Sequence, residues 1–163
     1  MRLPSSKILT HEEAVERYGP GRSLRLVFTN GCFDLLHAGH VELLAEARAL
    51  GDALVVGLNT DASVRRLGKG SSRPLVDQSA RAEVVAALEA VDGVTLFDED
   101  TPAELVDALL PDVIVKGGDY SVGEVVGGET VRARGGRVVI VPLKRGYSTT
   151  DLLAKIRKDE AQG

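Results

Sequence analysis

The chain has 163 residues, which fits one domain, and its 44% hydrophobic and 27% charged residues are typical of a globular protein. Its net charge of −4 gives no global attraction to nucleic acid or anionic lipid, so an anionic substrate would need a local cluster of positive charge. No run of about 18 apolar residues predicts a membrane span, and "MRLPSSKILTHEEA" lacks the apolar core of a secretory signal, so we expect a cytoplasmic protein.

Short apolar, β-branched runs alternate with stretches of helical spacing along most of the chain. The runs predict five buried strands, at residues 24–29, 53–58, 94–97, 112–116 and 137–142. The spacing between them predicts helices at residues 40–50, 78–91, 102–110 and 128–134, with a last helix at about 149–158. Such alternation predicts an α/β fold, a Rossmann-like three-layer αβα sandwich with a five-stranded parallel sheet.

Two of the predicted helices begin with capping signals. In "TPAE", Thr101 is predicted as the N-cap, with Pro102 at the first helical position and Glu104 reaching back as in a capping box. In "STTD", Ser148 or Thr149 is predicted to cap the last helix.

The pattern divides the chain into three parts. Residues 1–22 are expected to be a loose lead-in with one short helix, residues 23–158 the α/β domain, and residues 159–163 a C-terminal tail. Inside the domain, "LGKGSSRPL" (67–75) is too polar for the core and is predicted to be a mobile substrate loop.

The stretch "TNGCFDLLHAGH" follows the first predicted main strand, where ligands of open parallel sheets bind. Gly31 allows backbone N–H groups to approach an anion, and the helix beginning near Ala38 presents its positive end there. His37 and His40 share one helix face at i,i+3, and Gly39 leaves room for a ligand against the backbone. Two imidazoles could donate hydrogen bonds to phosphate oxygens as charge develops on them.

Other uses of these residues remain open at this point. G-x-G-x-x-G is absent, which disfavours a dinucleotide oxidoreductase, and "GKG" at 68–70 is not a Walker A loop. The two histidines could instead cap a helix and bond within the core, or bind a metal, for which only Asp34 offers a nearby third ligand. The single cysteine, Cys32, excludes a disulfide and a multi-cysteine zinc site and is predicted to be a small buried filler.

Two separated motifs resemble those of a known family. "NGCFDLLHAGH" resembles the first signature, G-x-F-D-x-x-H-x-G-H, of the cytidylyltransferase-like nucleotidyltransferases, and "GYSTTDLLAKI" (146–156) resembles the second. Within that superfamily, residues 26–158 look most like the sugar-phosphate adenylyltransferases that make ADP-D-glycero-β-D-manno-heptose, through "VGLNTDASVRRLGKG", "FDEDTPAEL" and "LPDVIVKGGDY".

The resemblance implies a reaction for residues 23–158. The phosphate of a heptose 1-phosphate would attack the α-phosphate of ATP, and pyrophosphate would leave with the help of Mg²⁺ that comes with the nucleotide. The alternative is a cytidylyltransferase acting on glycerol 3-phosphate or a related alcohol phosphate. In that group an arginine leads the second signature, where this chain has Leu143, which weakens the alternative and leaves the role of Arg145 open.

The resemblance also assigns site residues. His37 and His40 would stabilise the transition state, and Lys69 would clamp the triphosphate or the sugar phosphate. The residues implied to bind the nucleotide and its phosphates are Thr29, Asn30, Gly31, Phe33, Gly39, Asn59, Lys116, Gly118, Asp119, Ser148, Thr149 and Thr150. The residues implied to contact substrate or support the site are Asp34, Arg73, Arg81 and Arg145.

Two of the supporting residues have more than one interpretation. Asp34 could orient a histidine, hold Mg²⁺ or cap the helix. Arg81 could reach a phosphate or form a salt bridge.

Partners follow from the same resemblance. Many relatives fuse this domain to a sugar kinase, which 163 residues cannot contain, so we expect a separate sugar kinase and a homodimer, with neither nucleic acid nor membrane as a partner. A different class of function, a non-catalytic nucleotide-binding module, predicts ATP binding without turnover. Two imidazoles beside a phosphate cradle favour the enzyme, since binding alone does not need both.

Overall fold

A parallel sheet is the framework of the protein, seen in a computed structural model that describes residues 3–68, 70 and 72–160. Within these residues the strands are β1 (Ile8–Leu9), β2 (Leu26–Gly31), β3 (Ala53–Asn59), β4 (Gly93–Phe97), β5 (Val113–Gly117) and β6 (Arg137–Val141). The α-helices are α1 (His11–Tyr18), α2 (Ala38–Arg48), α3 (Asp61–Arg66), α4 (Gln78–Ala86), α5 (Ala103–Leu109), α6 (Gly128–Ala133) and α7 (Thr149–Glu160). Two 3₁₀ turns are η1 (Pro4–Lys7) and η2 (Val122–Glu124). The predicted Rossmann-like α/β sandwich is confirmed.

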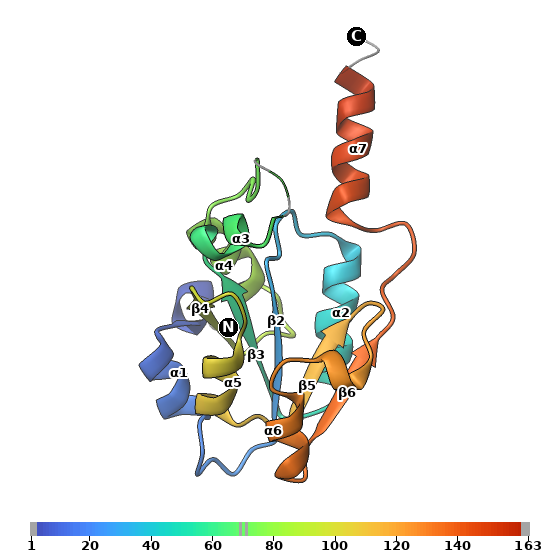
Figure 1. The fold of residues 1–163 in the computed structure, drawn as a ribbon. Helices are drawn as coiled ribbons and strands as arrows, with labels where there is room; N and C mark the ends of the chain where they lie inside the picture. Colours follow the sequence, from blue (N-terminus) through green and yellow to red (C-terminus); the bar gives the residue numbers. More distant parts are fainter. Residues whose placement is uncertain (1–2, 69, 71, 161–163) are drawn as a thin grey trace.

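The order of the strands creates a ligand crevice. All neighbouring strands are parallel, in the order β1-β4-β3-β2-β5-β6 (Figure 1). From β2 the chain adds β3 and β4 on one side and then returns to add β5 and β6 on the other. The connections therefore diverge between β2 and β5, which is where open parallel sheets bind ligands beyond their carboxyl ends.

Two apolar layers cover the faces of the sheet. One face packs against α2 and α4 through residues such as Leu44 and Val85, and the other packs against α1, α5 and α6 through residues such as Ala14, Leu105 and Val131. Every residue of the central strand β3 is buried, as expected for a parallel strand covered on both sides. The sheet therefore provides a rigid base for the loops at its carboxyl edge.

The N-terminal segment corrects two expectations. Residues 8–9 form a further strand, β1, that pairs with β4. Within the described residues the sheet therefore has six strands, and the prediction of five was wrong. Leu9 of β1 and the α1 residues Ala14 and Tyr18 are buried in the core layer that α1 and α5 form against the sheet. This part of the predicted loose lead-in therefore belongs to the domain. A two-residue strand is too short to show any hydrophobic period in the sequence.

The helix starts agree in part with their capping signals. At α7, the Ser148 Oγ accepts a hydrogen bond from Asp151 N at 3.0 Å, which confirms the predicted cap. At α5, Pro102 is the N-cap and makes no side-chain cap bond, so the capping box predicted for Thr101 is wrong. Thr101 instead borders a cavity at the carboxyl edge of the sheet. The short helix α3, capped by Thr60, was not predicted.

Among the described helices, none is both long and apolar enough to cross a membrane. The last helix, α7, extends away from the sheet after a connection from β6, with its first turn nearest the body of the protein (Figure 1). Its first turn is therefore the part that can contribute to a site at the carboxyl edge of the strands.

The contribution of β1 and α1 to the core can be tested with two leucines. We expect Leu9→Ala to lower the free energy of unfolding by about 2–4 kcal/mol, because Leu9 is buried against α1 and β4. Leu3→Ala, at a side chain that is 65% exposed, should change it by less than about 0.5 kcal/mol. Urea denaturation of both variants measures the difference, and equal effects would contradict the integration of this segment.

Candidate active site

Two cavities lie at the carboxyl edge of the strands and share one wall. The histidine-side cavity has a volume of about 240 Å³ and reaches His40, Arg73 and Thr149. The second cavity has a volume of about 310 Å³ and extends toward α5 and η2, where Asp100 and Glu124 border it. The residues common to both cavities are Asn30, Gly31, Cys32, Lys116 and Tyr120. These residues lie at the carboxyl ends of β2 and β5 or directly after them, so the two cavities meet at the predicted crevice.

The two histidines form a stacked pair at the start of α2. Their ring centroids lie 3.8 Å apart with an angle of 24° between the planes. The Nδ1 of His37 accepts a hydrogen bond from Gly39 N at 3.1 Å, and the Nδ1 of His40 accepts one from His37 N at 3.3 Å. Because each Nδ1 is an acceptor, we infer that a neutral ring carries its proton on Nε2. The helix cap therefore fixes the tautomer in which Nε2 is a donor.

The backbone before these histidines adopts unusual angles. Phe33 and Leu35 have φ values of +47° and +60°, in the left-handed region that costs energy for residues with a Cβ. These turns carry the chain from β2 into α2 within a few residues. A Cβ on Gly39 would lie 3.0 Å from two atoms of the His37 ring, so glycine at this position allows the ring to fold over the helix start.

Burial keeps His37 uncharged. Desolvation lowers the pKa of His37 below its ordinary value of 6.5, so the ring is neutral at pH 7. A neutral ring is required for Nδ1 to accept from Gly39 N, because protonation would occupy that atom. Charge state and helix cap therefore support each other.

Asp34 joins three segments around the histidine-side cavity. Its fully buried carboxylate accepts hydrogen bonds from Arg73 Nε at 2.6 Å, Leu75 N at 2.9 Å and Val76 N at 3.0 Å. Its main-chain oxygen accepts from Thr149 Oγ1 at 2.9 Å. Burial alone would raise the pKa of Asp34, but the bonds from Leu75 and Val76 and from Arg73 outweigh it and lower the pKa. Asp34 is therefore ionised and orients the loop after α3, rather than a histidine.

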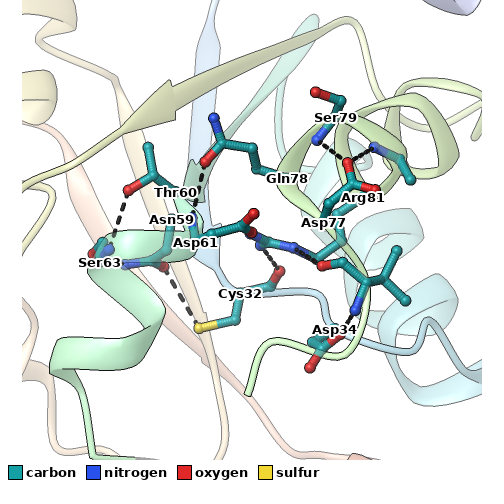
Figure 2. Close-up of polar contacts among 12 residues, drawn as sticks. Cys32, Asp34, Asn59, Thr60, Asp61, Ser63, Asp77, Gln78, Ser79 and Arg81 are labelled. Atoms are coloured by element: carbon teal, nitrogen blue, oxygen red, sulfur yellow. Dashed lines mark hydrogen bonds and ion pairs between the residues drawn. The ribbon is translucent and has the colours of Figure 1, made fainter. Parts of the chain in front are cut away.

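Arg81 has a structural position behind the site. Its side chain is 1% exposed, and it donates to the Cys32 main-chain oxygen at 2.6 Å, the Asp61 Oδ1 at 2.7 Å and the Val76 main-chain oxygen at 2.9 Å. Figure 2 shows the guanidinium between its acceptors on Cys32 and Asp61. Arg81 lines neither of the two cavities, so of the two interpretations open from the sequence the salt bridge is correct.

The wall shared by the cavities contains a cation and an amide. Lys116 Nζ, at the end of β5, donates to Asn30 Oδ1 at 3.4 Å, at the end of β2. It also lies 5.4 Å from the centre of the Tyr120 ring. Cys32 is buried, as predicted, and its thiol contacts Asn59 Oδ1 at 3.8 Å, as Figure 2 also shows. A positive charge therefore stands where ligands in either cavity would meet.

The structure places half of the predicted residues that it describes at the two cavities. Those that line one or both cavities are Asn30, Gly31, Phe33, Asp34, His40, Asn59, Arg73, Lys116 and Thr149. Those that line neither are Thr29, His37, Gly39, Gly118, Asp119, Ser148, Thr150, Arg81 and Arg145, although His37 stacks on His40 and Gly39 lies beneath it. Thr29 is 1% exposed within β2, and Arg145 is exposed to solvent. The predicted Lys69 lies outside the described residues.

Several residues at the cavities were not predicted. Asp100, Tyr120 and Glu124 border the second cavity, and each follows the carboxyl end of a strand, β4 or β5. That position was the available signal, since loops after parallel strands face the crevice. Among the described residues, no three His, Cys, Asp or Glu side chains gather to hold a metal, and the bonds to Asp34 occupy both of its oxygens. The side chains described at these cavities therefore do not fit a Mg²⁺ ion held by the protein alone.

The role of Arg81 predicts a large effect on stability. We expect Arg81→Met to lower the free energy of unfolding by about 3 kcal/mol, because it leaves Asp61 and two main-chain oxygens without their donor. Arg66→Met, which removes an exposed arginine paired with Asp100, should cost less than about 1 kcal/mol. Thermal and urea unfolding compare the two, and a mild effect at Arg81 would refute the bridging role.

The lowered pKa of His37 predicts a pH dependence. Because the pKa of His37 is lower in the folded protein than in the unfolded chain, the ring binds more protons in the unfolded chain as the pH falls through about 6.5. The free energy of unfolding should therefore fall as the pH drops from 8 to 5.5. His37→Asn, which keeps a cap that does not titrate, should show a smaller fall. Denaturation at both pH values and NMR titration of the ring test this, and a His37 midpoint above 6.5 would contradict it.

Comparisons with known proteins fit this geometry. Residues 28–155 match the family described as cytidylyltransferase-like. The bifunctional protein HldE of Citrifermentans bemidjiense is 54% identical over 155 residues, which cover 95% of this chain and 31% of that protein. The bifunctional protein HldE of Nitrobacter hamburgensis is 60% identical over 134 residues, covering 82% of this chain and 27% of that protein. The chain thus spans less than one third of the length of these curated relatives.

Solved structures share the fold. The lipopolysaccharide core biosynthesis protein from Thermoplasma volcanium is 30% identical, with a TM-score of 0.62, and the match covers 77% of this chain and all of that one. Pantothenate synthetase from Thermus thermophilus has a TM-score of 0.64 at 16% identity, covering 94% of this chain and 70% of that one, which shows a common fold alone. From the match over residues 28–155 and the relatives at 54–60% identity, this chain belongs to the cytidylyltransferase-like family.

Proposed function

We propose that this protein transfers AMP from ATP to D-glycero-β-D-manno-heptose 1-phosphate, releasing pyrophosphate and forming ADP-heptose. The observation that carries the nucleotidyl transfer is the stacked His37–His40 pair, whose Nδ1 atoms are both acceptors at the start of α2 beside the cavity. The sugar is supported by the resemblance of residues 26–158 to the heptose-phosphate adenylyltransferases and by the HldE relatives.

The proposed chemistry is one in-line substitution. A phosphate oxygen of the sugar phosphate forms a bond to the α-phosphorus of ATP, and the bond from that phosphorus to the bridging oxygen of the β-phosphate breaks. Pyrophosphate carries away the electron pair, so no covalent enzyme intermediate is needed. The charge on the non-bridging oxygens of the α-phosphate then meets the Nε2–H donors of the two imidazoles.

The two cavities suit the two substrates of this reaction. The histidine-side cavity is bordered by the imidazole of His40 and by Thr149 in the first turn of α7. A ring N–H and the N-terminus of a helix are both groups that bind phosphate oxygens. The second cavity has the carboxylates of Asp100 and Glu124, which can accept hydrogen bonds from sugar hydroxyls. Lys116 lines both and stands where an attacking phosphate oxygen and the α-phosphate would approach each other.

Other parts of the proposal rest on the family resemblance. We propose that Mg²⁺ arrives with ATP, that a sugar kinase acts in the same pathway, and that the protein works as a homodimer in the cytoplasm. The relatives at 54–60% identity are named bifunctional, which agrees with a second activity elsewhere in those proteins.

The histidines should be required for turnover. We expect His37→Ala and His40→Ala each to lower kcat about 10²–10³-fold, the usual loss for one donor to a developing oxyanion. His11→Ala, at an exposed residue of α1, should leave kcat unchanged. Comparison of His37→Asn with His37→Ala separates the loss of the helix cap from the loss of the imidazole. Turnover within a few-fold of wild type in either alanine variant would defeat the proposed mechanism.

The substrates are tested by pyrophosphate release. ATP, CTP, GTP and UTP are each paired with heptose 1-phosphate, glycerol 3-phosphate and hexose 1-phosphates. We expect ATP with heptose 1-phosphate to give the highest kcat/KM. Faster turnover of CTP with glycerol 3-phosphate would replace the proposal with the cytidylyltransferase alternative, and ATP binding without turnover would support a non-catalytic module.

A further inference from the structure

Arg73 is a second cation at the histidine-side cavity. Its side chain is 11% exposed, and the residue lines this cavity together with His40, Lys116 and Thr149. It does not line the second cavity, whereas Lys116 lines both. The position of Arg73 therefore distinguishes the two halves of the site.

Asp34 holds this arginine by one edge. The contact is from Nε to Asp34 Oδ2 at 2.6 Å, and an arginine has five N–H donors, of which Nε carries one. The same carboxylate accepts from Leu75 N and Val76 N, so it fixes the backbone that follows Arg73 as well as its side chain. A guanidinium held at Nε keeps a planar pair of terminal nitrogens in a defined orientation.

The charge at the cavity calls for such a group. A triphosphate carries several negative charges, and of the described residues that line the histidine-side cavity only Arg73 and Lys116 are cationic at every physiological pH. The ionised Asp34 offsets part of the positive charge of Arg73, but its side chain is fully buried behind the arginine. A buried ion pair adds little net stability, so its value here lies in orientation. Planar guanidinium groups match phosphate oxygens in pairs, which a lysine cannot do.

We infer that Arg73 binds the β- and γ-phosphates of the nucleotide and therefore the departing pyrophosphate, and that Asp34 is its positioning residue. The inference rests on the proposed nucleotidyl transfer and assigns the leaving group to the half of the site that Arg73 lines. Lys116, at the shared wall, then serves the α-phosphate and the acceptor, while Arg73 serves the part of ATP that leaves.

Inorganic pyrophosphate and AMP are the probes that separate these roles. In Arg73→Lys the ammonium can still pair with Asp34, so the variant should fold, but it lacks the paired donors. We expect its Kd for pyrophosphate, by titration calorimetry, to rise about 10- to 100-fold, the loss expected for one or two charged hydrogen bonds. Its Kd for AMP should change less than about twofold. Arg65→Gln, which removes an exposed charge on α3 that faces neither cavity, is the matched control and should bind both probes like wild type.

Kinetics extends the test to turnover. In Arg73→Lys we expect kcat/KM for ATP to fall about 10²-fold, as for loss of a donor to developing charge, while KM for the sugar phosphate stays within about threefold. Asp34→Asn should raise the Kd for pyrophosphate in the same way. The double variant, Arg73→Lys with Asp34→Asn, should bind pyrophosphate about as well as the weaker-binding single variant. If Asp34 acts only by positioning Arg73, its substitution should cost nothing further once Arg73 is replaced. A separate structural effect of Asp34 would add to the loss from Arg73→Lys, so additive losses would refute the positioning role.

The outcomes distinguish this inference from the proposed function. Unchanged pyrophosphate binding in Arg73→Lys, or a raised KM for the sugar phosphate with normal pyrophosphate binding, would overturn the assignment of Arg73. If wild type releases pyrophosphate from ATP only with another acceptor, the heptose proposal fails while the assignment of Arg73 is still tested by the same titrations. A thermal melt of each variant, matched to that of Arg65→Gln, confirms that folded protein is compared.

Discussion

The buried carboxylate of Asp34 is the interaction on which the arrangement of the site depends. It lies in the turn between β2 and α2, and it binds the side chain of Arg73 and the backbone of residues 75–76 in the loop after α3. Its main-chain oxygen receives Thr149 from the first turn of α7. Three loops from distant parts of the chain are thus held at one point. A carboxylate with no solvent contact is stable as an ion only when several donors surround it, so these loops must meet for the residue to be tolerated.

A second set of bonds keeps this point fixed to the sheet. Arg81 reaches from α4 to the main-chain oxygen of Cys32, two residues before Asp34, and to Val76, where one of the Asp34 bonds ends. Its pairing with Asp61 adds the start of α3. The buried guanidinium therefore lies behind the site and the carboxylate borders it. This division explains why one arginine supports the site while another, Arg73, faces its cavity.

The histidine pair shows how a helix start can prepare chemical groups. His37 uses Nδ1 to cap α2, and His40 uses Nδ1 to bind the backbone of His37, so both rings are fixed by the same turn. Burial lowers the pKa of His37, which keeps Nδ1 available as an acceptor. The backbone angles of Phe33 and Leu35 are the local strain that brings this turn to the end of β2. Orientation, tautomer and charge thus have a common origin.

The sequence by itself determined the features that depend on neighbouring residues. Apolar runs alternating with helical spacing predicted the parallel α/β sandwich, and local signals predicted the start of α2 near Ala38 and the Ser148 cap. The position of "TNGCFDLLHAGH" after a strand predicted that its residues would border the ligand crevice, because parallel strands all end at one edge.

Only the tertiary structure decided which groups meet across long separations. The strand β1 exists because β4 offers it a partner 86 residues later, and Thr101 faces a cavity instead of capping α5. The Arg81 guanidinium bonds a residue 49 positions away, and the Asp34 carboxylate bonds Val76, 42 positions away. No periodic pattern encodes such pairs, since each depends on how the loops pack above the sheet. The physical reason is that a buried charge is stable only beside hydrogen-bond partners. Which groups lie within hydrogen-bond distance depends on the fold of the whole chain.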